Sequence, residues 1–136
     1  MSYAVSAALQ GAVYQALVAD PVLGDLVGAA IYDALPAGNL PVTYVTLGPE
    51  TVQDRSDKTG SGAVHRFTVS IMTEVAGFGS AKATAAAVSD VLNDADLALS
   101  RGRLVAMRFE RATAKRTGTG GTRQIDLRFS ARVEDT

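Results

Sequence analysis

The fold is decided by the stretch Val64–Asp94, which reads VHRFTVSIMTEVAGFGSAKATAAAVSDVLND. In its first part polar and apolar residues alternate and place Phe67, Val69 and Ile71 on one side, which is the period of a half-buried strand. After two glycines the period becomes helical, and one face holds Ala83, Ala87 or Val88, Val91 and Leu92. We therefore predict a strand that leads into a helix, with the rest of the chain covering this unit or extending its sheet.

Length and composition predict one globular domain over residues 1–136. The chain is 47% hydrophobic and 20% charged, which is ordinary for a folded protein. A chain of this size buries roughly two thirds of the surface that its unfolded form exposes. Its 13 basic and 14 acidic residues give a net charge of −1. This balance argues against a protein whose main task is to neutralise the phosphates of a nucleic acid.

The chain has no cysteine, which excludes disulfides, thiolate nucleophiles and cysteine-bound metals. No apolar run approaches the roughly 20 residues that a bilayer requires. The N-terminus, Met1–Val5, has no basic region of the kind that opens a secretory signal. We predict a soluble protein that is cytoplasmic when synthesised and has no contact with a membrane.

Two helices are predicted before the first strand. Apolar residues recur every three or four positions over Ser2–Ala19, and Ser2 is a candidate cap. Asp20 followed by proline is typical of a helix start, so Pro21–Val27 is predicted to be a second, short helix that ends at Gly28.

Short and long strands follow. Ala30–Leu35 and Pro41–Leu47 are predicted strands on either side of a Pro-Ala-Gly-Asn turn. Near the C-terminus, alternation over Arg103–Ala114 and Arg123–Glu134 predicts an antiparallel hairpin, joined by the cationic, glycine-rich loop Lys115–Thr122. The predicted fold is α+β, a mostly antiparallel sheet with an N-terminal and a central helix packed on one face and a long C-terminal β-hairpin.

The segment Gly48–Gly62 differs from its surroundings in composition. Its only aliphatic side chain is Val52, among charged residues, hydroxyls and glycines. Such a segment buries too little apolar surface to offset its ordering entropy, so we expect a mobile arm. It is either ordered by a partner or a passive flexible loop.

No group of residues predicts catalysis, a metal or a cofactor. His65 is the only histidine and is expected to be structural, at the edge of the core. Gly77–Ser80 is predicted to be a turn whose Ser80 caps the next helix, because it lacks the remainder of a phosphate-binding motif. Asp90, Asp94 and Asp96 are expected to lie at a solvated helix end.

Charges of both signs alternate with the apolar residues of the predicted strands. Such mixing is typical of an exposed or protein-facing surface and is not typical of a phosphate-binding one. The residues concerned are Arg66, Arg108, Arg128, Arg132, Glu110, Asp126 and Glu134.

The order of these features resembles a known family. An N-terminal helix precedes IYDALP at 31–36 and PVTYVTLG at 41–48, and a charged loop contains DRSD at 54–57. HRFTVSI at 65–71 then leads to a turn, an alanine-rich helix and a closing strand that contains RFSARVE at 128–134. The chain resembles the tail-completion, or tail-terminator, proteins of long-tailed phages and of phage-derived gene transfer agents.

The resemblance implies a protein that is not an enzyme and forms a ring, expected to be hexameric. The ring would cap the tail tube, stop its polymerisation and join it to head and neck proteins, with DNA only passing through the lumen. We hypothesise that the charged arm and the cationic tip mediate assembly through Gln53, Asp54, Arg55, Asp57, Lys58, Lys115, Arg116 and Arg123.

Three other functions remain open. In the same class are a neck or head-completion protein and a tail-tube subunit, which would polymerise into long cylinders. The third is a nucleic-acid-binding module that uses Lys115, Arg116, Arg123 and Arg128, and its affinity for DNA would be sensitive to salt.

Overall fold

A computed structural model describes residues 3–117 and 121–135 of the chain. In this part of the chain, helices and strands follow one another as α1 (Ser6–Ala19), α2 (Pro21–Val27), β1 (Ile31–Tyr32), β2 (Thr43–Asp54), β3 (Ser61–Thr73), α3 (Gly79–Leu92), β4 (Arg103–Thr117) and β5 (Thr122–Asp135). The strands form one mostly antiparallel sheet, and β4 and β5 are its C-terminal hairpin. The predicted α+β fold is confirmed.

The sheet has the order β1-β2-β3-β5-β4. Only β1 and β2 pair in parallel, and every other pair of neighbours is antiparallel. The two central strands, β3 and β5, pair along their full lengths, from Ser61 opposite Asp135 to Thr73 opposite Arg123. The strand of the Val64–Asp94 stretch therefore lies at the centre of the sheet, and β1 and β4 are its two edges.

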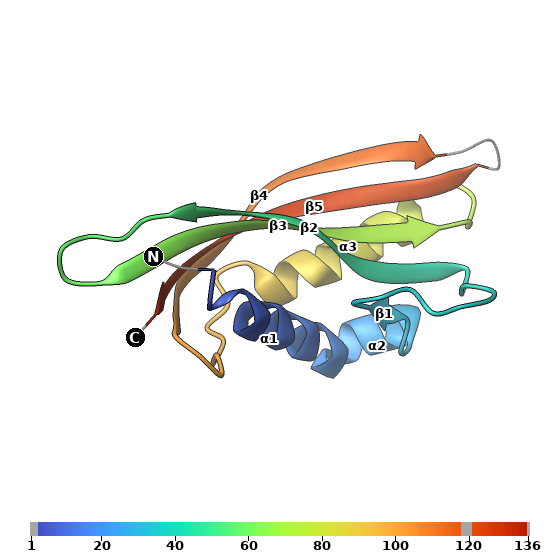
Figure 1. Cartoon of the computed structure of the whole chain (residues 1–136). Coiled ribbons are helices and arrows are strands. Elements are labelled where there is room, and N and C mark those ends of the chain that lie inside the picture. The colour runs from blue at the N-terminus through green and yellow to red at the C-terminus, as the bar shows by residue number, and fades with distance from the viewer. Residues whose placement is uncertain (1–2, 118–120, 136) are drawn as a thin grey trace.

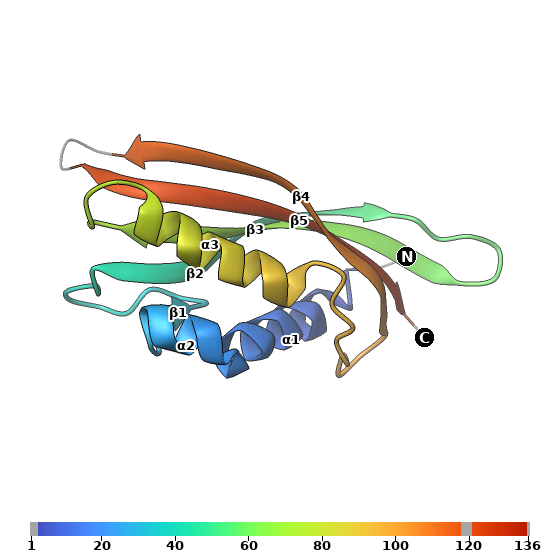
Figure 2. The same cartoon turned by 180° about the vertical axis from the view of Figure 1, so that it is seen from behind.

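All three helices lie on one side of the sheet (Figures 1 and 2). The helix α3 packs against β3, β5 and β4, whereas α1 and α2 lie toward β1 and β2. The core between these layers contains Phe129, which is fully buried. Its ring stacks on Phe67 at 5.7 Å and meets Phe109 edge-on at 5.9 Å between ring centroids. Burial of such a side chain stabilises the fold by about 1.5–3 kcal/mol.

The two N-terminal helices follow their sequence signals. In α1 the side chains of Leu9, Val13 and Leu17 are buried at the predicted spacing. The helix begins at Ser6, later than predicted, and the proposed cap Ser2 is not among the described residues. In α2 the carboxylate of Asp20 accepts a hydrogen bond from the backbone N–H of Leu23 at 3.0 Å. This is the predicted N-terminal cap.

The helix α3 differs from its prediction in two details. Ala87, Val88 and Leu92 are buried as predicted, but Ala83 is exposed because the buried stripe passes through Ala81, Thr84 and Ala85. Ser80 does not cap the helix, because α3 already begins at Gly79 and the cap position is occupied by Phe78, which makes no side-chain capping bond.

The prediction of a mobile arm over Gly48–Gly62 was wrong. Strand β2 continues to Asp54 and β3 begins at Ser61, so that only residues 55–60 form the turn of a long hairpin. Composition misled here because a strand pair satisfies the hydrogen bonds of its backbone whatever its side chains are. The arm is an extension of the sheet.

The loop predicted at Lys115–Thr122 is also shorter in the structure. Lys115, Arg116 and Thr117 belong to β4 and pair with Gln124, Arg123 and Thr122 of β5. The cationic residues therefore lie within the ladder of the hairpin. The glycine-rich part of the prediction, residues 118–120, lies outside the described residues.

Candidate assembly interface

The structure divides the eight predicted interface residues into two groups at opposite ends of the sheet (Figure 1). Gln53, Asp54, Arg55, Asp57 and Lys58 lie at the turn between β2 and β3, and Lys115, Arg116 and Arg123 lie at the far end of β4 and β5. They do not form one site. Any contact that uses both groups must be made with two different partners, or with two different surfaces of one assembly.

The turn between β2 and β3 is built from its own polar groups. The Asp57 carboxylate accepts hydrogen bonds from the backbone N–H groups of Thr59 and Gly60, each at 2.9 Å. Bonds from the backbone and hydroxyl of Thr59, then from Gly60, hold the pKa of Asp57 below its usual value. A side chain at Gly62 would meet the Arg55 carbonyl oxygen at 2.8 Å, so only glycine permits this close approach.

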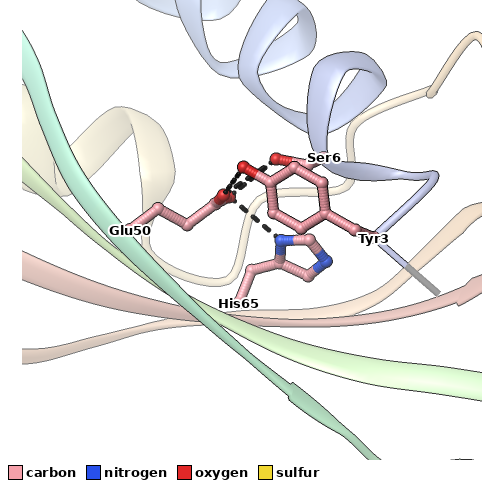
Figure 3. A network of polar contacts seen from close by, with 4 residues as sticks. All are labelled: Tyr3, Ser6, Glu50 and His65. Atoms are coloured by element: carbon pink, nitrogen blue, oxygen red, sulfur yellow. Dashed lines mark hydrogen bonds and ion pairs between the residues drawn. The ribbon is translucent and has the colours of Figure 1, made fainter. Parts of the chain in front are cut away.

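The same hairpin is attached to the helical layer by a partly buried polar network (Figure 3). The Glu50 carboxylate of β2 accepts hydrogen bonds from His65 Nδ1 at 3.0 Å, from Ser6 Oγ at 2.9 Å and from the Tyr3 hydroxyl at 2.8 Å. Burial raises the pKa of Glu50, but the bonds from His65, Tyr3 and Ser6 outweigh it, so the pKa is lower than usual. The network joins β2, β3 and the start of α1.

His65 is fully buried, as expected for a structural histidine of the core. Its partner Glu50 was missed because the residue was assigned to the mobile arm. Alternation could not have found it, because an irregularity of β2 between Leu47 and Glu50 moves the inward side chains from odd to even positions. Within the described part of the chain, Nε2 of His65 has no hydrogen-bond partner. The polar groups of Glu50, Ser6 and Tyr3 are all hydrogen-bonded within the network. We therefore interpret the network as structural.

At the other end of the sheet, two of the three predicted cations are engaged by their own chain. Lys115 Nζ lies 3.6 Å from Asp126 Oδ2. Arg123 donates to the carbonyl oxygens of Gly121 at 2.9 Å and Val75 at 3.4 Å. Arg116 is exposed and has no ion pair with any described residue. Arg116 is therefore the predicted cation most available to a partner.

The open face of the sheet carries the mixed charges that the sequence predicts. Glu110 lies between two arginines, with Arg66 Nε and Arg128 Nε each 3.4 Å from its Oε1. Burial alone would raise the pKa of Asp126, but hydrogen bonds from Gln124 and Ser70 and the charge of Lys115 lower it below its usual value. Both carboxylates hold neighbouring strands together across this face.

Within residues 3–117 and 121–135, no three His, Asp or Glu side chains are grouped so as to hold a metal ion. No helix in the same part of the chain is long and apolar enough to cross a membrane.

Comparisons with known proteins identify the family. No curated protein matches the chain. A solved structure, "Virion of native gene transfer agent (GTA) particle", contains a chain that is 63% identical and superposes with a TM-score of 0.94, over 98% of this chain and 99% of that chain. The family model "Tail completion protein gp17" matches residues 11–134. The chain therefore belongs to the tail completion protein gp17 family.

Proposed function

We propose that this structural protein of a phage-type tail is a tail terminator, which forms a closed ring on the end of the tail tube, stops its growth and provides the surface that joins the head. The observation that carries the proposal is the similarity to a chain of a gene transfer agent virion, which extends over nearly the whole of both chains. Membership of the tail completion family supports the same role.

The shape of the molecule is compatible with a ring. A ring of identical subunits requires heterologous contacts, in which one surface of each copy binds a different surface of the next. The sheet has two different edges, β1 and β4, and its two long hairpins project at opposite ends (Figure 2). Each copy thus offers distinct surfaces to neighbours, tube and neck. We assign these contacts to the eight residues predicted above, with Arg116 and the β2–β3 turn as the most accessible.

The partners in this proposal are further copies of the chain, expected to be six, the tail-tube protein and the proteins of the neck. DNA only passes through the ring. A nucleic-acid-binding module is disfavoured because Lys115, Arg123 and Arg128 are already engaged with groups of their own chain. A neck protein and a tube subunit remain the alternatives within the same class.

The test combines native mass spectrometry with assembly of the tube. We expect the purified chain to give a closed oligomer of about six copies, either alone or on the tube. Added to the tail-tube protein of the same particle, it should shorten the tubes and be found at one end of each by negative-stain electron microscopy. Long filaments of the chain alone would instead identify a tube subunit, and tubes of unchanged length would contradict the proposal.

A further inference from the structure

We infer that neighbouring copies bind one another through opposite charges, with the β4 edge of one copy against the α2–β1 edge of the next. The inference rests on the proposed ring and specifies its contact. It begins with the distribution of charge along the chain. All 13 lysines and arginines lie after residue 54, whereas five of the 14 acidic residues lie in residues 1–54. The net charge of −1 conceals this segregation.

The fold places the two kinds of charge on opposite edges of the sheet. Strand β4 has five basic residues and a single acidic one, and it is an edge strand. We define its cationic edge as Arg108, Arg111, Lys115 and Arg116. At the other edge lie β1 and α2, in a part of the chain without any lysine or arginine. We define the acidic edge as Asp20, Asp25 and Asp33.

Two arginines of the cationic edge lie opposite other arginines, whereas Lys115 is paired with Asp126. Arg111 lies opposite Arg128, and Arg116 lies opposite Arg123. Like charges directly opposite one another in a ladder destabilise it. Arg128 is paired with Glu110 and Arg123 donates to backbone carbonyls, but Arg111 and Arg116 have no ion pair with any described residue. An anionic surface of a partner would relieve this repulsion.

The acidic edge is equally free of cations. Asp25 is exposed and has no ion pair within the described residues, and Asp33 accepts a hydrogen bond from the neutral side chain of Gln10. Apolar side chains are exposed beside both sets of charges. Val22 is 57% and Leu35 54% exposed near the acidic edge, and Val105 and Phe109 of β4 are 44% and 39% exposed. Charged groups around exposed apolar ones are typical of protein interfaces.

A second copy is the partner that satisfies both edges at once. The edges carry opposite signs and lie on opposite sides of one molecule, so the same contact repeated with a rotation uses every edge and closes a ring. Complementary charge also excludes wrong orientations, since like edges repel. A polyanion such as DNA could bind the cationic edge, but it would leave the acidic edge without a binding partner.

The test exchanges the charges in two separate variants. Arg108→Glu with Arg111→Glu and Arg116→Glu makes both edges acidic, and Asp25→Lys with Asp33→Lys makes both edges basic. We expect each variant alone to show copy–copy association weakened at least about 100-fold, because like charges are brought together. Mixed in equal amounts, the two variants should associate in alternation, which an even-numbered ring such as a hexamer permits. Native mass spectrometry would then show both masses in a 1:1 ratio.

Two controls separate charge at the edges from general effects. Arg108→Lys with Arg111→Lys and Arg116→Lys keeps the charge and should associate like the wild type. Asp90→Lys with Asp96→Lys changes the net charge as much as the acidic-edge variant does, but at the end of α3, and should also associate. Thermal unfolding by circular dichroism checks that every variant is folded.

The outcomes distinguish the inference from the proposed function. Rings that persist in both charge-exchange variants would overturn the inference and leave the terminator proposal standing. Open filaments that dissociate in the variants and return in the mixture would support the inference and overturn the terminator proposal. A wild type that shows no association on or off the tube overturns both. If the arginine variant loses only its binding to a 20-base-pair DNA duplex, the cationic edge binds DNA and the inference is wrong.

Discussion

The two long hairpins use the same kind of strand pairing but are stabilised differently. The β2–β3 hairpin is attached to α1 by the contacts of Glu50 with buried His65, with Ser6 and with exposed Tyr3. Among the described residues of the outer β4–β5 hairpin, β4 is exposed and holds two arginines opposite arginines of β5, and Arg123 donates to the Val75 carbonyl oxygen. One hairpin is thus fixed by a polar network, and the other depends on its packed inner half and on ion pairs at its surface.

This difference separates the residues that maintain the fold from those that are free to bind. Where β5 passes over α3, its inward side chains are buried, including Phe129 and Leu127. Beyond the helices the strands present charged groups, of which Arg111 and Arg116 have no ion pair with any described residue.

The packed half of the β4–β5 hairpin should be the most sensitive region. Phe129→Ala removes a fully buried ring together with its contacts to Phe67 and Phe109. We expect a loss of about 3–5 kcal/mol in the free energy of unfolding, measured by urea denaturation. The control Thr113→Ala, on the exposed half of β4, should change it by less than about 0.5 kcal/mol. Equal losses would show that the two halves are not distinct.

Removal of the polar network that attaches the β2–β3 hairpin to α1 should cause the next largest loss in the free energy of unfolding. Glu50→Ala leaves His65 Nδ1 buried without its acceptor, and we expect a loss of about 1–3 kcal/mol in the free energy of unfolding. Gln53→Ala, an exposed position three residues after Glu50 in β2, is the control and should be close to neutral. If Glu50→Ala unfolded like the wild type, the network would contribute nothing to the attachment.

Because of the Glu50 carboxylate, the free energy of unfolding should fall at acid pH. The pKa of Glu50 is below its usual value of 4.5 in the folded chain, so its stabilisation is complete above about pH 4.5 and is lost as the pH falls through the lower folded value. The lowered pKa values of Asp57 and Asp126 act in the same direction. Glu50→Gln should therefore be less stable than the wild type at pH 7, with the difference shrinking below pH 4.5. A constant difference down to pH 3 would be inconsistent with this linkage.

Removal of the ion pairs of the open face should cause the smallest loss in the free energy of unfolding. Glu110→Gln removes the partner of Arg66 and Arg128, both of which are partly exposed. We expect a loss of less than about 1 kcal/mol, and a smaller loss in 0.5 M salt because exposed ion pairs are screened. Chemical denaturation with urea at low and high salt measures both values. A loss as large as that of Glu50→Ala would remove the contrast between the two hairpins.

Much of the fold could be predicted from the sequence because its signals are local. The alternation of β5 and the Asp20-Pro21 start of α2 appear in the structure as expected. The β2–β3 hairpin could not be predicted from its composition, because strand β3 supplies the partners of its backbone. The pairing of β3 with β2 is part of the tertiary structure and does not follow from the composition of either segment.

The candidate interface was predicted only in part, for a related reason. Charged residues at turns identify accessible groups, and the structure places Asp57 and Arg116 at opposite ends of the sheet. Which cations are already engaged depends on the folded chain, since Arg123 donates to the carbonyl oxygens of Gly121 and Val75, whereas the register places Arg111 opposite Arg128. Neither the buried partner of His65 nor the opposite charge of the two edges follows from a single stretch of sequence.

The central claim is that the covered half of the sheet maintains the fold while the projecting parts serve assembly. It is tested most directly by a variant in which an Asn-Gly turn replaces residues 55–62 and joins the paired residues Asp54 and Ala63. The measurement is co-sedimentation of this variant with the tail-tube protein, next to its melting temperature. We predict a melting temperature within a few degrees of the wild type and a loss of binding to the tube, whereas the two edges that join neighbouring copies are unchanged. Unchanged binding to the tube by the folded variant would contradict the account.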